Sequence, residues 1–226
     1  MRIVTFGEVM LRLQPPNFQR FIQANSFEIE YGGAEANVAS SLANWGEDAM
    51  FVTKLPNNPI GMACLSQLRK YNINTQYIKL DGDRLGIYYC EKGASQRASN
   101  VVYDRANSAI SNVTSKDFDW EYIFKGVDWF HFSGITPALG DNVAKVCLDA
   151  CKQAKNMGVK ISCDLNYRKK LWTTEKANQV MSELLKYVDV CIGNEEDADN
   201  VLGIKAPDTK ITKGEINRSG YHYVAE

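Results

Sequence analysis

The chain has 226 residues, of which 45% are hydrophobic, and its formal net charge is −1 at pH 7. This length suffices for a sizeable core, in one large domain or two small ones. A charge so close to zero offers no electrostatic basis for binding nucleic acid or a membrane surface. We see no signal peptide, and no apolar stretch has the length of a membrane-spanning helix.

Six cysteines are spread along the chain without a CxxC pair, so their spacing does not indicate a zinc site. They are Cys64, Cys90, Cys147, Cys151, Cys163 and Cys191. We expect them to be small buried hydrophobic side chains of a protein in the reducing cytoplasm.

The N-terminal residues predict a buried strand followed by an irregular excursion. Residues 3–6 form the expected strand, and Glu8 comes soon after its end. Residues 11–31 contain two prolines and several aromatic residues, which is not typical of a helix. We expect one or two strands here that leave the main body.

Two adjacent glycines, Gly32 and Gly33, then predict a sharp turn into a helix that ends at Gly46. The expected buried face of this helix, at helical spacing, consists of Ala34, Val38, Leu42 and Trp45. Such a turn exposes backbone N–H groups to a ligand, and Asn37 in the first turns could bind a polyol hydroxyl. The alternative is an ordinary turn before a core helix.

The middle of the chain predicts a strand at 49–55 and a helix at 60–71, and then three strands without a helix between them. These strands are expected at 76–80, 86–91 and 100–105. They suggest a small antiparallel or mixed sheet, which together with the earlier excursion could cover a crevice as a lid.

After residue 115, strands and helices alternate, which favours a parallel sheet covered on both faces. Strands are expected at 127–132, 159–163 and 188–192, and helices at 142–157 and 174–187. Residues 207–219 are predicted to form a polar loop, and residues 220–226 the start of a helix.

Polar residues and one glycine follow the predicted parallel strands. They are Glu8, Gly134, Asn166, Arg168, Asn194 and Glu196. Ligands of open α/β sheets bind at this edge, so the pattern predicts a binding site. Each residue also has a purely structural interpretation: Arg168 could be a surface cation, Asn166 could cap a turn, and residues 195–197 could be the acidic first turn of a helix.

The predicted lid adds Tyr88, Tyr103 and Arg105. Strand alternation puts Tyr103 and Arg105 on one face, where they could bind a hydroxylated anion or could simply face solvent. His131 lies in an apolar strand and is expected to be a core histidine.

Four stretches of the sequence resemble the ribokinase-like (PfkB) carbohydrate kinases, and within that family the 2-keto-3-deoxygluconate group. The stretches are 32–37 (GGAEAN), 103–109 (YDR with SA), 132–139 (FSGITPAL) and 164–172 (DLNYRKKLW). The resemblance covers nearly the whole chain, and the last stretch is the most specific.

The resemblance implies an α/β fold, a ribokinase-like three-layer sandwich with a central, mostly parallel sheet and a small β lid. Residues 1–226 would form one C-terminally incomplete domain, with lid segments 11–31 and 85–105. The implied activity is ATP-dependent phosphorylation of a primary hydroxyl of 2-keto-3-deoxygluconate or a similar sugar acid. ATP and Mg²⁺ would be the cofactors, and the lid would join two subunits in a cytoplasmic homodimer or higher homo-oligomer.

The resemblance also implies individual roles. Gly33 and Asn37 would hold sugar hydroxyls; Tyr88, Tyr103, Arg105 and Thr136 would line the substrate pocket; and Arg168 would pair with the substrate carboxylate. Asn166, Asn194 and Glu196 would bind the nucleotide, and Glu196 or Asp197 would act on Mg²⁺ through water.

The sequence departs from the family pattern in four ways. Glu35 stands where many ribokinases have glycine, and Pro56 stands where many have a second glycine. Asp197 stands in place of the usual glutamate of an Asn-x-x-Glu element. The family's Gly-Ala-Gly-Asp motif, which supplies an anion hole and the catalytic base, does not occur in the sequence. The resemblance therefore implies no catalytic base within this chain.

Three alternatives remain open. The chain could belong to a kinase of another sugar, such as fructose or ribose. It could be a fragment that binds a sugar acid without phosphorylating it. A Rossmann dehydrogenase is disfavoured, because no GxGxxG follows a strand.

Overall fold

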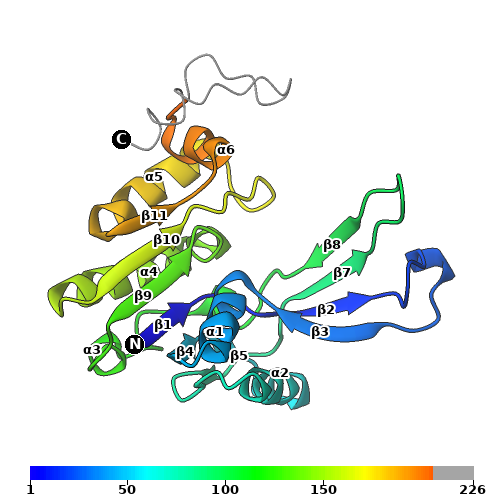
Figure 1. Ribbon diagram of the computed structural model, residues 1–226, viewed down its shortest axis with the longest axis horizontal. Coiled ribbons are helices and arrows are strands. Elements are labelled where there is room, and N and C mark those ends of the chain that lie inside the picture. The colour runs from blue at the N-terminus through cyan, green and yellow to red at the C-terminus, as the bar shows by residue number, and fades with distance from the viewer. Residues whose placement is uncertain (206–226) are drawn as a thin grey trace.

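A computed structural model describes residues 1–205 as a layered body from which a narrow arm projects (Figure 1). The predicted loop at 207–219 and the helix start at 220–226 lie outside the described residues. Among the residues that are described, no helix is long and apolar enough to cross a membrane.

The body is built on a sheet of five strands in the order β11-β10-β9-β1-β4, and every neighbouring pair is parallel. The strands are β1 (Arg2–Phe6), β4 (Asp48–Val52), β9 (Trp129–Ser133), β10 (Lys160–Asp164) and β11 (Val190–Ile192). This confirms the predicted α/β fold with a central parallel sheet. Because the strands are parallel, their carboxyl ends meet at one edge.

Helices cover both faces of the sheet. They are α1 (Ala34–Asn44), α2 (Pro59–Lys70), α3 (Trp120–Ile123), α4 (Asp141–Asn156), α5 (Thr174–Leu184) and α6 (Glu195–Asp197). Short 3₁₀ turns lie at Phe21–Gln23, Ile110–Asn112, Pro137–Leu139 and Leu185–Tyr187, and a π-helical turn lies at Ala198–Leu202. The larger core lies between the sheet and α3, α4 and α5, and a second core lies beneath α1 and α2.

The arm is a separate sheet of four strands in the order β3-β2-β7-β8. Its strands are β2 (Met10–Gln14), β3 (Glu28–Gly32), β7 (Ile87–Glu91) and β8 (Asn100–Asp104). Two antiparallel pairs, β2 with β3 and β7 with β8, are joined by the parallel pairing of β2 and β7. The segments expected to leave the main body, 11–31 and 85–105, supply these strands.

The strand predicted at 76–80 does not join the arm. Only Lys79–Leu80 is extended (β6), and it pairs in parallel with β5 (Lys54–Leu55) in a two-stranded sheet. The Nζ of the buried Lys54 lies 2.9 Å from Asp81 Oδ2, immediately after β6. Residues 76 and 77 form a turn, so only the last two residues of the predicted strand are extended.

The predicted buried face of α1 is also wrong. Trp45 is 78% exposed and lies just past the helix, whereas Glu35, Ala36 and Ala39 are buried. The reason is size: alanine side chains let α1 approach β1 and β4 closely, and a larger apolar residue is not needed there. An apolar pattern alone could not distinguish these two faces.

His131 and four of the six cysteines are buried, as the sequence predicts. His131 is buried, and its Nδ1 lies 2.9 Å from Ser162 Oγ; burial lowers the pKa of its imidazole. Four of the six cysteines are buried, whereas Cys90 is half-buried and Cys191 is exposed.

Glu35 joins the first turn of α1 to the end of β9. Its Oε1 accepts hydrogen bonds from the Ser133 backbone N–H (2.9 Å), from Ser133 Oγ (2.6 Å) and from Thr136 Oγ1 (2.8 Å). The side chain is 1% exposed, and this burial raises the pKa of its carboxyl although the three donors oppose the rise. This contact fixes the helix N-terminus against the carboxyl edge of the sheet.

The corrected face of α1 predicts how two substitutions differ. Ala39→Leu should lower the free energy of unfolding by about 1–3 kcal/mol, because Ala39 is fully buried and a larger side chain would overpack the interface. Trp45→Ala should change it by no more than about 0.5 kcal/mol. Urea unfolding of both variants measures this, and a larger loss for Trp45→Ala would contradict the described face.

Glu35 should make the stability depend on pH. Glu35→Ala should cost at least about 2 kcal/mol, since it leaves buried donors unpaired. Because the folded pKa is raised, the contribution of Glu35 is greatest below the ordinary glutamate pKa of about 4.3 and is lost as the pH rises through the folded value. In Glu35→Gln this loss should disappear. Urea unfolding at several pH values measures the free energy of unfolding of both proteins. If wild type and Glu35→Gln showed the same dependence of this free energy on pH, the prediction would be refuted.

Candidate functional site

A cavity of about 1890 Å³ opens at the carboxyl edge of the central sheet, between the body and the arm. Its lining includes ten of the eleven residues predicted for substrate, nucleotide or metal, namely Gly33, Asn37, Tyr88, Tyr103, Arg105, Asn166, Arg168, Asn194, Glu196 and Asp197. The volume exceeds the roughly 300–1,000 Å³ of a typical single-ligand pocket, so it has room for two small molecules.

The Gly-Gly turn forms one wall of the cavity. A methyl group on Gly33 would overlap the carbonyl oxygen of Glu8, so only glycine permits this close approach of two backbones. A carbon added at Gly32 would lie 3.7 Å from Tyr88 Oη and 3.8 Å from Asn37 Oδ1. A hydroxyl and an amide therefore lie beside the helix N-terminus, where they can both donate and accept hydrogen bonds.

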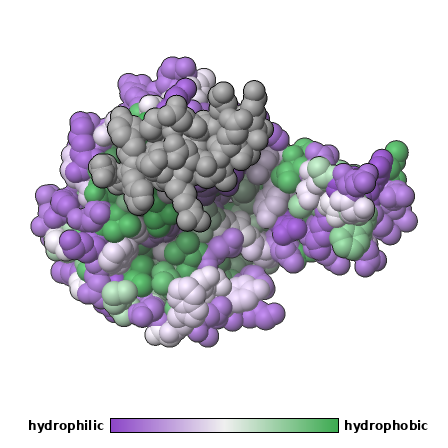
Figure 2. Space-filling model, turned by 45° about the horizontal axis from the view of Figure 1, so that its top comes forward, coloured by the Kyte–Doolittle hydropathy of each residue, from purple (hydrophilic) through white to green (hydrophobic). Residues whose placement is uncertain are grey.

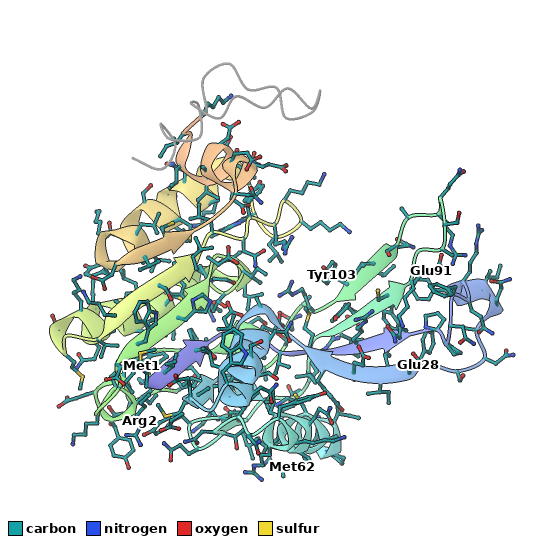
Figure 3. All side chains as sticks on the ribbon, viewed as in Figure 1. Met1, Arg2, Glu28, Met62, Glu91 and Tyr103 are labelled. Atoms are coloured by element: carbon teal, nitrogen blue, oxygen red, sulfur yellow. The ribbon has the colours of Figure 1, made fainter. Side chains whose placement is uncertain are left out.

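The inner face of the arm carries aromatic rings and cations, as strand alternation predicts. Tyr88 and Tyr103 are opposite each other on β7 and β8, with ring centroids 6.1 Å apart. Arg105 Cζ lies 5.6 Å from the centroid of the Tyr103 ring. Figure 3 shows Tyr103 nearer to the body than Glu28 and Glu91, which mark the outer part of the arm.

Lys170 reaches Tyr103 from the opposite side of the cavity. Its Nζ lies 5.5 Å from the ring centroid, and it belongs to the loop after β10. The sequence predicts no role for Lys170, although the run of cations at 168–170 indicates a strongly basic loop. Tyr103 is thus contacted by a cation from the arm and by one from the body.

Glu8 does not present its carboxylate to the cavity as a free acid. It is 3% exposed, it forms an ion pair with Arg105 Nη2, and its Oε1 accepts a hydrogen bond from Ser108 Oγ at 3.0 Å. Burial raises the pKa of Glu8, and the nearby Arg105 and Ser108 partly counteract that rise. The charge of Arg105 is therefore largely compensated within the protein.

Arg168 differs from Arg105 in this respect. It is exposed on the cavity wall, and within residues 1–205 it forms no ion pair. Asn166 has a left-handed backbone (φ 38°), and its N–H donates to Asp164 Oδ1 at 3.2 Å, so the chain turns sharply after β10. This turn brings residues 167–170 to the cavity and leaves Arg168 as a cation that can pair with a ligand anion.

The predicted nucleotide and metal residues meet where β11 ends. Asn194 begins α6, and its Oδ1 accepts the Asp197 N–H at 2.8 Å. Asp197 Oδ1 in turn accepts the Tyr167 N–H at 3.0 Å, which ties the two loops together. Among the described residues, no cluster of three or more His, Cys, Asp or Glu side chains could hold a metal by itself. Glu196 and Asp197 suit Mg²⁺ only if water and phosphate supply most of the ligands.

Two residues that the sequence placed at the site do not line the cavity, Gly134 and Thr136. Thr136 is fully buried and donates to Glu35 Oε1, while its neighbour Ile135 lines the cavity. The turn after β9, in which Thr136 N–H donates to Ser133 O at 3.1 Å, directs Thr136 inward. The sequence carried no signal for this reversal, because Ile135 and Thr136 both follow the strand.

Comparison with known proteins identifies relatives along nearly the whole chain. The sequence pattern of the pfkB family carbohydrate kinases matches residues 1–219. A 2-dehydro-3-deoxygalactonokinase of Haloferax volcanii is 37% identical over 201 residues, which are 88% of this chain and 63% of that protein. The chain thus spans less than two thirds of the length of this relative.

Solved structures of sugar kinases also resemble this chain over most of its length. A 2-dehydro-3-deoxygluconokinase of Thermotoga maritima is 55% identical with a TM-score of 0.94, and the match covers 100% of this chain and 67% of that one. A sugar kinase of Pyrococcus horikoshii, solved in complex with ATP, is 25% identical with a TM-score of 0.78, over 89% of this chain and 66% of that one. Sequence pattern, sequence identity and fold agree, and the chain belongs to the PfkB family of carbohydrate kinases.

Proposed function

We propose that this chain is the sugar-binding part of an ATP-dependent kinase that phosphorylates a primary hydroxyl of 2-keto-3-deoxygluconate or a closely similar sugar acid. The observation that carries the proposal is the exposed Arg168, which forms no ion pair within residues 1–205 and shares the cavity with Asn37, Tyr88 and Tyr103. The names of the relatives from Haloferax and Thermotoga support a 2-keto-3-deoxy sugar acid.

Each wall of the cavity has a separate task in this proposal. Asn37 and the Tyr88 hydroxyl, beside the Gly-Gly turn, bind sugar hydroxyls. Arg168 pairs with the substrate carboxylate through its planar guanidinium. Arg105, whose charge Glu8 compensates, contributes directed hydrogen bonds rather than net charge.

The nucleotide lies toward α6 in this proposal, with Asn166 and Asn194 near its phosphates. The ATP complex of the Pyrococcus relative supports ATP as phosphoryl donor. Mg²⁺ bound there would neutralise charge on the phosphates. Glu196, which is exposed on the cavity wall, would hold it through water, whereas Asp197 mainly keeps the β10 loop in position.

A second candidate is a chain that binds the sugar acid without phosphorylating it. The chain covers 63% of the length of the Haloferax relative, and the resemblance assigns the role of catalytic base to no residue of these 226. A positioned general base typically contributes about 10²- to 10⁴-fold to the rate. Ligand binding, rather than turnover, is therefore the first property to measure, and it is common to both candidates.

We further propose a cytoplasmic homodimer that forms through the outer face of the arm. An apolar row crosses all four strands there, formed by Ile29, Leu13, Tyr89 and Val102. Ile29 is 62% and Val102 49% exposed, and hydrophobic residues are visible on the arm in Figure 2. Exposed apolar surface of this kind favours association.

Ile29→Lys should therefore convert a dimer into a monomer, because a charge would be buried in the apolar contact. Sedimentation velocity measures this. The matched control is Trp45→Lys, the same kind of change at an exposed residue of the body, which should leave the dimer intact. A wild-type protein that sediments as a monomer at every concentration would refute the dimer.

Arg168→Ala should weaken binding of 2-keto-3-deoxygluconate by about 30- to 1,000-fold, corresponding to roughly 2–4 kcal/mol for an unpaired charge. Binding of fructose should hardly change, since a neutral sugar offers no carboxylate. Isothermal titration calorimetry measures both.

Lys145→Ala, which removes an exposed cation of α4 that does not line the cavity, is the control and should leave binding of both ligands unchanged. Wild-type protein that binds fructose as tightly as the acid would favour a neutral-sugar kinase. Binding of neither ligand would contradict the proposed function.

A further inference from the structure

We propose that Glu8 is a positioning residue that holds Arg105 in place and fixes the arm against the body. The part of this inference that concerns sugar binding rests on the proposed function, whereas the part that concerns the arm does not.

Four chain segments connect the arm to the body, and Glu8 lies in or beside each of them. It belongs to the first segment, between β1 and β2. Gly33, between β3 and α1, packs on its carbonyl oxygen, and a carbon added at Gly86, just before β7, would lie 2.8 Å from its Oε1. The fourth segment leaves β8 at Arg105, which forms the ion pair with Glu8.

Both carboxylate oxygens of Glu8 are used, and their partners belong to different parts of the molecule. Oε2 pairs with Arg105, the first residue after the arm strand β8. Oε1 accepts from Ser108, which is 1% exposed and directly precedes the core residues Ala109 and Ile110. The Ala109 N–H donates to Arg84 O at 2.9 Å, and Leu11 N–H donates to Gly86 O at 2.9 Å, so the junction is closely bonded.

The ion pair is buried enough that neither partner is easily replaced by water. The Glu8 side chain is 2% and the Arg105 side chain 14% exposed. Removal of one member of a buried pair leaves the other charge uncompensated, and the remaining group then moves toward solvent or another partner. Arg105 lines the cavity next to Tyr103, so a displaced guanidinium would change the substrate wall.

A purely structural ion pair would stabilise the fold without setting the arm or the sugar site, and two experiments distinguish these roles. The test variant is Glu8→Gln, which keeps the size and the acceptor oxygen and removes the charge. The matched control is Glu30→Gln. Glu30 pairs with Arg12 at 3.3 Å, but both residues belong to the arm, on β3 and β2, so this pair does not join the arm to the body.

The first experiment is hydrogen–deuterium exchange of the protein without ligand. In Glu8→Gln we expect amides of β7 and β8 to exchange several-fold faster than in wild type, while amides of β9 and β10 keep their rates. Glu30→Gln should not show this pattern. Equal exchange in Glu8→Gln and wild type, or an equal rise across arm and body, would overturn the role of Glu8 at the junction. Should Glu8→Gln fail to fold, Ser108→Ala, which removes one bond to Glu8, must show the same pattern more weakly.

The second experiment is a double-mutant cycle on binding of 2-keto-3-deoxygluconate. Glu8→Gln should weaken binding by about tenfold, which is of the size of the interaction energies measured between residues in direct contact. In the background of Arg105→Gln, the same substitution should have no further effect, because Glu8 acts through Arg105. Additive losses would overturn the positioning role.

The two results also separate this inference from the proposed function. If wild-type protein binds no sugar acid, the proposed function fails and the positioning of a sugar-binding Arg105 fails with it, while the exchange experiment still decides the role of Glu8 at the junction. If wild type binds and the cycle is additive, only the inference fails.

Discussion

The structure depends on two glutamates that are buried where the body, the arm and the cavity meet. Burial of a carboxylate is costly unless donors surround it, and both side chains meet this condition with donors from distant parts of the sequence. Glu8 joins β1 to Arg105 and Ser108, about a hundred residues away, and Glu35 joins α1 to Ser133 and Thr136. The site therefore rests on directed polar contacts in addition to the apolar cores.

These contacts also determine how charge is distributed over the cavity. Arg105 is paired with a buried carboxylate, whereas Arg168 extends into the cavity without an ion pair within the described residues. Two arginines in one pocket would suggest a doubly charged ligand if they were counted from the sequence alone. Glu8 compensates Arg105, so the remaining positive charge of the cavity comes from the loop after β10, which carries Arg168, Lys169 and Lys170. A cationic wall of this kind suits an anionic group on a ligand.

Sequence patterns predicted the parts of the molecule that depend on periodicity. The parallel strands, the helices between them and the polar residues at strand ends follow from alternation and from the carboxyl-edge rule. The errors concern features that periodicity does not encode. Trp45 continues an apolar helical pattern yet is exposed, because alanines already make the close contact, and Thr136 turns inward toward a buried glutamate that the pattern could not place. Lys170 was overlooked because its contact, Tyr103, is 67 residues away in the chain.

The contact between Lys170 and Tyr103 shows how the two walls of the cavity are coupled. Tyr103 lies on β8 and Arg105 directly follows that strand, with Arg105 Cζ 5.6 Å from the centroid of the Tyr103 ring. Lys170 extends from the loop that also carries Arg168 and contacts that ring across the cavity. A shift of the arm would therefore move the aromatic wall relative to Arg168, the cation expected to bind the carboxylate. Under the proposed function, selection for the acid would therefore depend on the distance between the arm and the β10 loop as well as on Arg168.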